Sequence, residues 1–258
     1  MIPSRKQRTF NAWFAGHARG RIRATFAATH VHGLARMREL SGAGPILVVS
    51  NHTAWWDPLV VLHVSEHLIG SDGYAMMDAK NLRKMPFFAL VGGFGVDLDR
   101  PEDGAAVMKY AARLLDRPGR LCWVFPQGRE RPVTARPLDF RPGAAEIARV
   151  SKRALVVPAA IRYEFGSEER PFLYVSFGEP LAVERDVKAA RVTQEAAVEA
   201  ELARVERAIQ GEGAEAFDEV HRVRPSAAAA VATSLLTAIT RHGGPPALPL
   251  ARGRSDRS

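Results

Sequence analysis

The chain has 258 residues, of which 47% are hydrophobic and 25% charged, and a formal net charge of +8. This is the composition of a globular protein, and it excludes a disordered or collagen-like chain. A single cysteine, Cys122, excludes an internal disulfide framework and a zinc or iron–sulfur site built from several cysteines. The basic excess indicates an anionic partner, such as a membrane surface, a nucleic acid or a phosphate-bearing substrate.

The basic excess lies at the amino terminus. Residues 1–38 contain eight Lys and Arg side chains and no Asp or Glu, so the remaining 28 basic residues balance the 28 acidic ones. We interpret the first 38 residues as an electrostatic handle on a body that is formally neutral.

The first predicted element is a helix within residues 9–29, a segment that combines aromatic side chains with arginines. Its aromatic members are Phe10, Trp13, Phe14 and Phe26. Such a composition is typical of an amphipathic helix that lies on anionic lipid, where each basic group contributes about 1 kcal/mol. The alternative is a helix that packs its aromatic side chains on the core of the domain.

No membrane-spanning helix is predicted. A span needs about 20 mostly apolar residues, and the longest stretches without a charged residue, 40–56 and 225–240, are shorter. The amino terminus also lacks the continuous apolar core of a secretory signal, so we expect none.

Strands and helices are expected to alternate through the rest of the chain. Short apolar runs predict strands at residues 45–50, 74–77, 95–98, 120–125, 154–161 and 172–177. Apolar residues at helical spacing predict helices at residues 58–66 and 102–116. Helices are also expected at residues 143–152 and at 184–210, where Glu and Arg are interleaved, with a weaker Ala-rich helix at 225–240. This order predicts an α/β fold with a mixed, largely parallel sheet flanked by helices.

The first candidate site follows the strand at residues 45–50. His52 and Asp57 lie five positions apart in a strand-to-helix turn, where α/β folds place reactive groups. A neutral histidine can take a proton from a hydroxyl while a carboxylate orients the ring and stabilises the imidazolium. The alternatives are a turn histidine and an Asp57 that caps the next helix, with Pro58 in its first turn.

Two further segments offer groups for an anion. Arg100 lies just past the strand at 95–98, where it would bind a phosphate or form a salt bridge to Asp97 or Asp99. The turn after the strand at 120–125 offers the backbone of Gly128 and the side chain of Arg129, unless it is merely a solvated turn.

A fourth segment, residues 156–161, is an apolar strand interrupted by Pro158. Proline within a strand predicts an edge position or a bulge. The segment is either a wall for an apolar substrate chain or an ordinary core strand.

Taken in order, these four segments resemble the four motifs of the glycerol-phosphate and lysophospholipid acyltransferase family. His52 and Asp57, with four residues between them, match the HX4D pattern of the first motif. The other motifs resemble residues 93–100, 125–128 and 157–161, and Lys80 resembles a lysine that the family carries between its first two motifs. The resemblance covers about residues 31–180, and four motifs in order are far more specific than one.

The resemblance implies transfer of a fatty acyl group from acyl-CoA or acyl carrier protein to a hydroxyl of a lysophospholipid or glycerol phosphate, in phospholipid biosynthesis. His52 would be the general base and Asp57 would orient it. The acceptor would be bound by Lys80, Arg100, Phe125, Pro126, Gln127, Gly128 and Arg129. No metal and no other cofactor is implied.

Gln127 departs from the family, which usually has a glutamate there. Glutamine keeps an acceptor oxygen but lacks the charge, so a different hydroxylated lipid, such as a glycolipid or an amino-acid lipid, is an alternative acceptor. A non-catalytic membrane-binding or nucleic-acid-binding module is a further alternative. Because the body is neutral and the basic arm has few aromatic residues for stacking, we expect no nucleic-acid partner.

We therefore predict three parts: a basic aromatic helical segment at residues 1–30, an acyltransferase domain at 31–222, and an Ala-rich helix with a disordered tail at 223–258. The resemblance implies a monotopic enzyme, which favours a membrane-anchoring role for the first segment. The expected location is the cytoplasmic face of a membrane, with anionic lipid as a partner.

Overall fold

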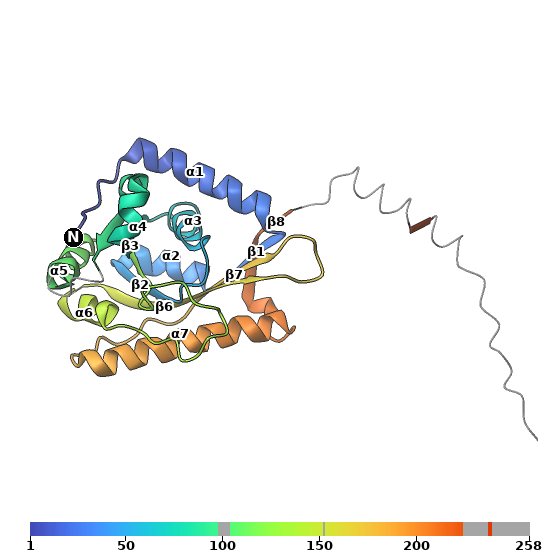
Figure 1. The fold of residues 1–258 in the computed structure, drawn as a ribbon. Coiled ribbons are helices and arrows are strands. Elements are labelled where there is room, and N and C mark those ends of the chain that lie inside the picture. Colours follow the sequence, from blue (N-terminus) through green and yellow to red (C-terminus); the bar gives the residue numbers. More distant parts are fainter. Residues whose placement is uncertain (98–103, 152, 224–236, 239–258) are drawn as a thin grey trace, which may run out of the picture. The chain divides into compact units, whose positions relative to one another are not determined.

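The structure, a computed structural model, describes residues 1–97, 104–151, 153–223 and 237–238. Within these residues, eight strands form one sheet in the order β4-β3-β5-β2-β6-β7-β1-β8 (Figure 1). The strands are β1 (Ala28–His32), β2 (Ile46–Ser50), β3 (Asp72–Asp78), β4 (Gly93–Val96), β5 (Arg120–Val124), β6 (Leu155–Glu164), β7 (Phe172–Phe177) and β8 (Phe217–Arg222). The pairs β6–β7 and β1–β8 are antiparallel and the other neighbours are parallel. The predicted mixed, largely parallel α/β sheet is confirmed.

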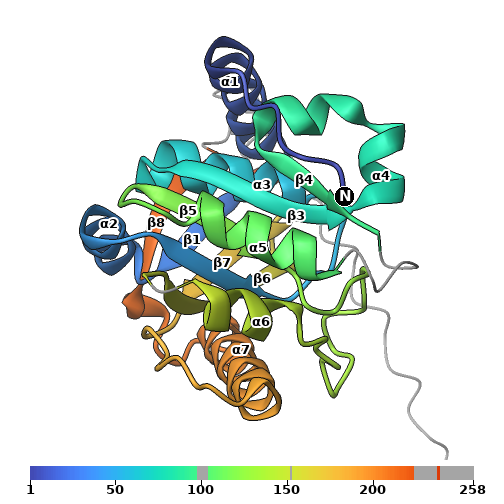
Figure 2. The ribbon, with the colours of Figure 1, turned by 90° about the vertical axis from the view of Figure 1, so that its left-hand side faces the viewer.

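Helices cover both faces of this sheet. They are α1 (Arg8–Thr25), α2 (Leu34–Ala43), α3 (Asp57–His63), α4 (Ala79–Lys84), α5 (Gly104–Leu114), α6 (Gly143–Val150) and α7 (Val187–Ile209). A π-helical segment, η1 (Val64–Ile69), continues α3, and two 3-10 helices, η2 (Pro86–Val91) and η4 (Ala214–Ala216), complete the set. Figures 1 and 2 show α6 and α7 on one face and α1, α2 and α3 on the other.

The centre of the sheet is apolar on both faces. Along β2, Leu47 and Val49 pack with side chains of α5, α6 and α7, whereas Ile46 and Val48 pack with side chains of α2 and α3. All five residues of β2 are buried. This double burial is why the segment reads as a continuous apolar run rather than as an alternating one.

Several predicted elements are confirmed with shifted ends, and some elements were not predicted. The strand at 45–50 corresponds to β2, and the strand at 154–161 continues to Glu164 as β6. The unpredicted elements are β1, α2, α4 and β8. Arg100, and the predicted Ala-rich helix and tail apart from Val223 and residues 237–238, lie outside the described residues.

Helix α1 packs part of its aromatic surface on the domain. Asn11, Ala15, Ala18 and Ile22 form its buried stripe, and the Phe14 ring lies 5.4 Å from that of Phe87. Trp13, by contrast, is 64% exposed. Phe14 thus fits the interpretation that the helix packs on the core, and Trp13 fits the interpretation that it lies on lipid. Membrane binding stays a prediction. Within the described residues, none of the helices has both the length and the apolar character that crossing a bilayer requires.

Part of the basic arm is used inside the fold. Lys6 Nζ lies 2.8 Å from a Glu66 oxygen and 2.7 Å from an Asp72 oxygen, and its side chain is 12% exposed. Arg36 pairs with Glu179. The electrostatic handle inferred from the sequence is therefore smaller than the formal charge of the arm suggests.

Candidate active site

The candidate site lies at the carboxyl ends of the parallel strands β2 and β5. His52 comes two residues after the end of β2, and Asp57 is the first residue of α3. The turn after β5 begins at Phe125. Because parallel strands point the same way, their carboxyl ends bring these two loops together at one edge of the sheet.

The structure brings His52 and Asp57 into direct contact. His52 Nδ1 lies 2.6 Å from Asp57 Oδ2, and Asp57 is completely buried. The backbone N–H groups of Thr53 and Ala54 donate to the same oxygen at 2.9 and 3.3 Å. Helix α3 begins at Asp57 without a side-chain cap, so this carboxylate serves the preceding loop rather than capping the helix.

The loop that carries His52 is attached to both neighbouring strands. The amide of Asn51 accepts from the Ile161 N–H and donates to the Ile161 carbonyl, each at 2.9 Å. On the other side, Gln127 Oε1 accepts from the His52 N–H at 2.6 Å. These bonds fix the backbone around the imidazole before any substrate arrives.

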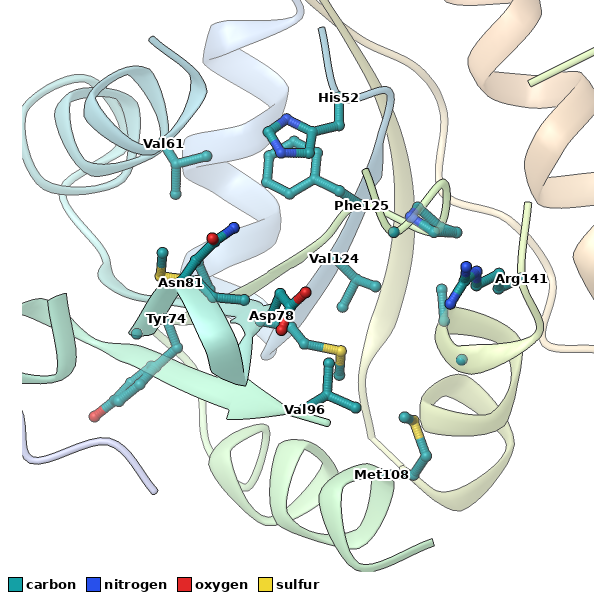
Figure 3. Close-up of a pocket in the computed structure, with 18 of the residues that line it drawn as sticks. His52, Val61, Tyr74, Asp78, Asn81, Val96, Met108, Val124, Phe125 and Arg141 are labelled. Carbon is teal, nitrogen blue, oxygen red and sulfur yellow. The ribbon is translucent and has the colours of Figure 1, made fainter. Parts of the chain in front are cut away.

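A large cavity opens beside the imidazole. It has a volume of about 940 Å³ and includes His52 and Phe125 in its wall, with their ring centroids 4.8 Å apart (Figure 3). Because a buried carboxylate accepts from Nδ1, the other ring nitrogen of His52, Nε2, is the one left for a substrate. The His52 side chain is 21% exposed whereas Asp57 is sealed, which is the arrangement a base and its orienting group require.

The walls of the cavity differ in character. Its apolar members include Val61, Met76, Met77, Phe88, Val96, Met108 and Val124. Charged and polar members include Asp78, Asn81, Lys109, Arg129, Arg141 and Glu146. Figure 3 shows Asn81 and Arg141 on opposite sides of the cavity, with Val124 and Val96 between them.

The turn after β5 contributes most of its predicted residues to the cavity. Phe125, Pro126, Gly128 and Arg129 line it, whereas Gln127 is 5% exposed and holds the His52 backbone instead. Gly128 has a φ of +69°, and a Cβ there would lie 3.3 Å from the guanidinium carbon of Arg141. Glycine is therefore needed both for the backbone conformation and for the close approach of Arg141.

Two arginines of this wall are available to a ligand. The side chains of Arg129 and Arg141 are exposed, and neither forms an ion pair with any residue that the structure describes. Arg141 was not predicted. No local sequence pattern could have found it, since it lies 13 residues beyond Gly128. The fold brings it back to the turn, where its backbone N–H donates to the Pro126 carbonyl at 2.9 Å.

The remaining predicted binding residues are placed differently. Lys80 lies on α4 and is exposed; its neighbours Asp78 and Asn81 line the cavity, but Lys80 does not, although it is among the described residues. Arg100 lies outside the described residues. Asp97 lines the cavity, and its Oδ2 lies 3.5 Å from Arg83 Nη2.

The fourth segment is a core strand. Val157 and Ile161 are fully buried among side chains of the α2 and α3 face and do not line the cavity. The expectation that Pro158 marks an edge is wrong, because β6 lies between β2 and β7. The missing N–H of Pro158 is tolerated because the pairing of β6 with β7 begins only at the next residue, Ala159. The Pro158 carbonyl still accepts from the Gly178 N–H at 2.9 Å.

Tyr163 is a site residue that the sequence analysis missed. Its hydroxyl donates to Asp57 Oδ1 at 2.6 Å. Burial, together with the neighbouring Asp57, raises the pKa of Tyr163 well above its usual value, so the hydroxyl keeps its proton. The predicted strand stopped at Ile161, two residues too early to include it.

Other groups in the described residues offer no second reactive centre. Burial raises the pKa of Cys122 to about 12, and its thiol is sealed inside β5. No group of three or more His, Cys, Asp or Glu side chains is placed to hold a metal ion in the part of the chain that the structure describes. The prediction that no metal or other cofactor takes part stays a prediction.

The chain matches a known protein family. A family model described as Acyltransferase matches residues 28–162, which is more than half of the chain. The matched stretch runs from β1 into β6 and contains both His52 and Asp57. None of the curated proteins matches the chain.

Proposed function

This chain belongs to the acyltransferase family and is an acyltransferase enzyme, and we propose that it moves a fatty acyl group from an acyl thioester to the hydroxyl of a lysophospholipid or glycerol phosphate. The observation that carries the proposal is the 2.6 Å contact between His52 Nδ1 and Asp57 at the edge of a large cavity. The acyl donor would be acyl-CoA or acyl carrier protein.

In the proposed mechanism, His52 is the general base. As the acceptor oxygen attacks the thioester carbonyl, its proton passes to His52 Nε2 and a tetrahedral intermediate forms. Asp57 keeps the proton of the ring on Nδ1 and stabilises the imidazolium. When the intermediate collapses, the carbon–sulfur bond breaks, the imidazolium returns the proton to the departing thiolate, and an ester and a free thiol result. A positioned base of this kind contributes about 10²–10⁴-fold.

The shape and lining of the cavity support a lipid substrate. At about 940 Å³, it is at the upper end of the range for small-molecule sites, and its methionine and aliphatic wall suits an alkyl chain. The acyl chain would lie along Met76, Val96 and Met108, with its carboxyl carbon toward His52.

The free arginines support an anionic acceptor. Arg129 and Arg141 lie on the same side of the cavity as the turn after β5, and a guanidinium binds phosphate oxygens in a bidentate manner. Gln127, the residue that suggested an unusual acceptor, is turned toward the His52 backbone, where a neutral amide oxygen accepts as well as a carboxylate would. The sequence-based reason for a glycolipid or amino-acid lipid acceptor is therefore weaker than the reason for a phosphate.

We place the enzyme on the cytoplasmic face of a membrane, as a peripheral or monotopic protein that binds anionic lipid. Two exposed tryptophans, Trp13 at 64% and Trp55 at 57%, and the exposed arginines Arg5, Arg8 and Arg19 support this location. No nucleic-acid partner is proposed.

The proposal is tested by identifying products. Purified protein is incubated with lysophosphatidic acid, glycerol 3-phosphate, a lysophospholipid with a zwitterionic headgroup, a glycolipid and an amino-acid lipid, each with acyl-CoA or acyl carrier protein loaded with the same acyl chain. Mass spectrometry then measures each ester. We expect acylation of a phosphate-bearing acceptor; acylation confined to the uncharged glycolipid or the amino-acid lipid would overturn the proposed acceptor class.

A further inference from the structure

The two oxygens of the Asp57 carboxylate have different partners. Oδ2 binds His52 Nδ1 and the backbone N–H groups of Thr53 and Ala54. Oδ1 accepts from the hydroxyl of Tyr163 at 2.6 Å, and no other hydrogen bond to it is found among the described residues. Because Asp57 is completely buried, water does not replace a lost donor easily.

Tyr163 is itself held firmly. It lies near the end of β6, a strand with neighbours on both sides, and its ring stacks on that of Phe26 with centroids 5.5 Å apart. Phe26 in turn packs edge-on against Trp56, the residue before Asp57, at 5.3 Å. The phenol is thus fixed relative to the carboxylate that it binds.

We propose that Tyr163 is a positioning residue of the active site: its hydroxyl fixes the orientation of the Asp57 carboxylate and, through it, the ring of His52. The inference deepens the proposed function and rests on it for the role of His52 as base. Tyr163 does not line the cavity, so it would act through Asp57.

The hydroxyl has two effects on the carboxylate. Together with the N–H groups of Thr53 and Ala54, which hold Oδ2, it limits rotation of the carboxylate and keeps Oδ2 in line with His52 Nδ1. It also withdraws negative charge from the carboxylate, because a hydrogen bond to a charged acceptor is strong. Without it, Asp57 would stabilise the imidazolium more strongly, and His52 would remain protonated, and so unable to act as a base, up to a higher pH.

The variant Tyr163→Phe tests this directly, since it keeps the ring and its stacking and removes one oxygen. The space left by this oxygen is smaller than the volume of about 30 Å³ that a water molecule takes in the liquid. We therefore expect no water molecule to replace the lost hydroxyl. We expect the midpoint of the His52 ring titration, followed by NMR, to move up by about one pH unit. The acidic limb of the pH profile of kcat/KM should move by the same amount, and kcat should fall about tenfold with KM for the acyl thioester within about twofold.

Tyr174→Phe is the matched control. Tyr174 lies on the adjacent strand β7 with its ring on the other face of the sheet, and its hydroxyl makes no hydrogen bond within the described residues. We expect its His52 titration and its kcat to equal those of the wild type. A loss of stability in Tyr163→Phe with an unmoved His52 titration would show a structural role alone and would overturn the proposal.

Two measurements keep the test decisive. If Tyr163→Phe fails to fold, the Asp57→Asn variant replaces it. The NMR chemical shift of the ring carbon that bears the Tyr163 hydroxyl, labelled with carbon-13, is compared between this variant and the wild type. An unchanged chemical shift would overturn the contact. The NMR titration needs no substrate, so it separates the two claims. Wild-type protein that transfers no acyl group would refute the proposed function, whereas a moved titration would still support the coupling of Tyr163 to His52.

Discussion

Two histidines at strand ends lie beside a buried carboxylate: His52, just past β2, beside Asp57, and His32, the last residue of β1, beside Glu201. His52 Nδ1 meets its carboxylate directly at 2.6 Å, whereas His32 Nδ1 lies 3.8 Å from Glu201 Oε2. In the second cluster, Ser176 stands between the two and donates to Glu201 at 2.5 Å, and Arg204 binds the same oxygen.

The two clusters also differ in access. His52 lines the large cavity, and its second ring nitrogen is left for a substrate. His32 does not line that cavity, and Ser176 is completely buried. Desolvation, helped by the nearby charge of Arg204, lowers the pKa of His32 and favours its neutral form. On this geometry we expect the His52 cluster, and not the cluster of Ser176, His32 and Glu201, to take part in the reaction.

The largest expected effect contrasts the two histidines. His52→Ala should lower kcat of acyl transfer by about 10²–10⁴-fold, because it removes the proposed base. His32→Ala should leave kcat within about twofold, although it removes a partly buried side chain (16% exposed) and should lower the melting temperature. Steady-state rates measured on both variants test this, and equal losses of activity would remove the distinction between the clusters.

A third histidine, His63, shows the effect of burial, to which the nearby charges of Arg19 and Arg23 add. Burial lowers the pKa of His63 to about 4 from its ordinary 6.5. Below pH 6.5 His63 is protonated in the unfolded chain, whereas in the folded chain it stays neutral until the pH falls to about 4. Stability should therefore fall as the pH drops through this window, by about 3 kcal/mol in all.

His63→Gln should flatten that dependence. The free energy of unfolding of the variant and the wild type, measured with urea at pH 7, 5.5 and 4.5, tests it. The exposed residue His17 provides the control variant His17→Gln, which should retain the slope of the wild type. Parallel curves for His63→Gln and the wild type would contradict the expectation.

The arginine-lined side of the cavity, where we propose that the acceptor phosphate binds, predicts a smaller effect on substrate binding rather than on the chemical step. Arg141→Ala should raise KM for a phosphate-bearing acceptor about tenfold while kcat at saturation stays close to that of the wild type. Arg149→Ala, which removes an arginine that is paired with Glu146, is the control. An Arg141→Ala variant whose KM is unchanged would show that this guanidinium does not meet the acceptor.

The smallest expected effect separates the inward and outward aromatic residues of α1. Trp13→Ala should weaken binding to vesicles containing anionic lipid by about fivefold and leave the melting temperature unchanged. Phe14→Ala, which removes a ring that packs on Phe87, should lower the melting temperature instead. Vesicle co-sedimentation and thermal unfolding of both variants test this contrast, and undiminished binding by Trp13→Ala would argue against a lipid-facing α1.

Much of the fold was accessible from local patterns. The apolar run that forms β2 and the apolar residues at helical spacing in α5 predicted those two elements, because a central strand and a helix packed on it bury many apolar side chains. The strands β1 and β8 were missed. β1 carries two histidines in five residues, and β8 is largely charged at the edge of the sheet, so neither has the apolar pattern of a buried strand.

The site divides in the same way. The spacing of His52 and Asp57, and the turn from Phe125 to Arg129, could be found because each set is local in the chain. Tyr163 and Arg141 could not, since Tyr163 reaches the site from the end of β6 and Arg141 from the loop before α6, and no local pattern links them to His52 or Gly128. Gln127 was found, but its contact with the His52 backbone was not, because a side-chain direction depends on what packs around it.

The amino-acid sequence by itself determined the α/β class and which histidine and carboxylate follow the central strand, because strand and helix periodicity and short-range spacing are written along the chain. Only the tertiary structure decided which carboxylate oxygen His52 meets, that Tyr163 holds the other oxygen, and that His52 rather than His32 borders a cavity. Those facts depend on distances between strands that are far apart in the sequence and on which side chains are sealed from water.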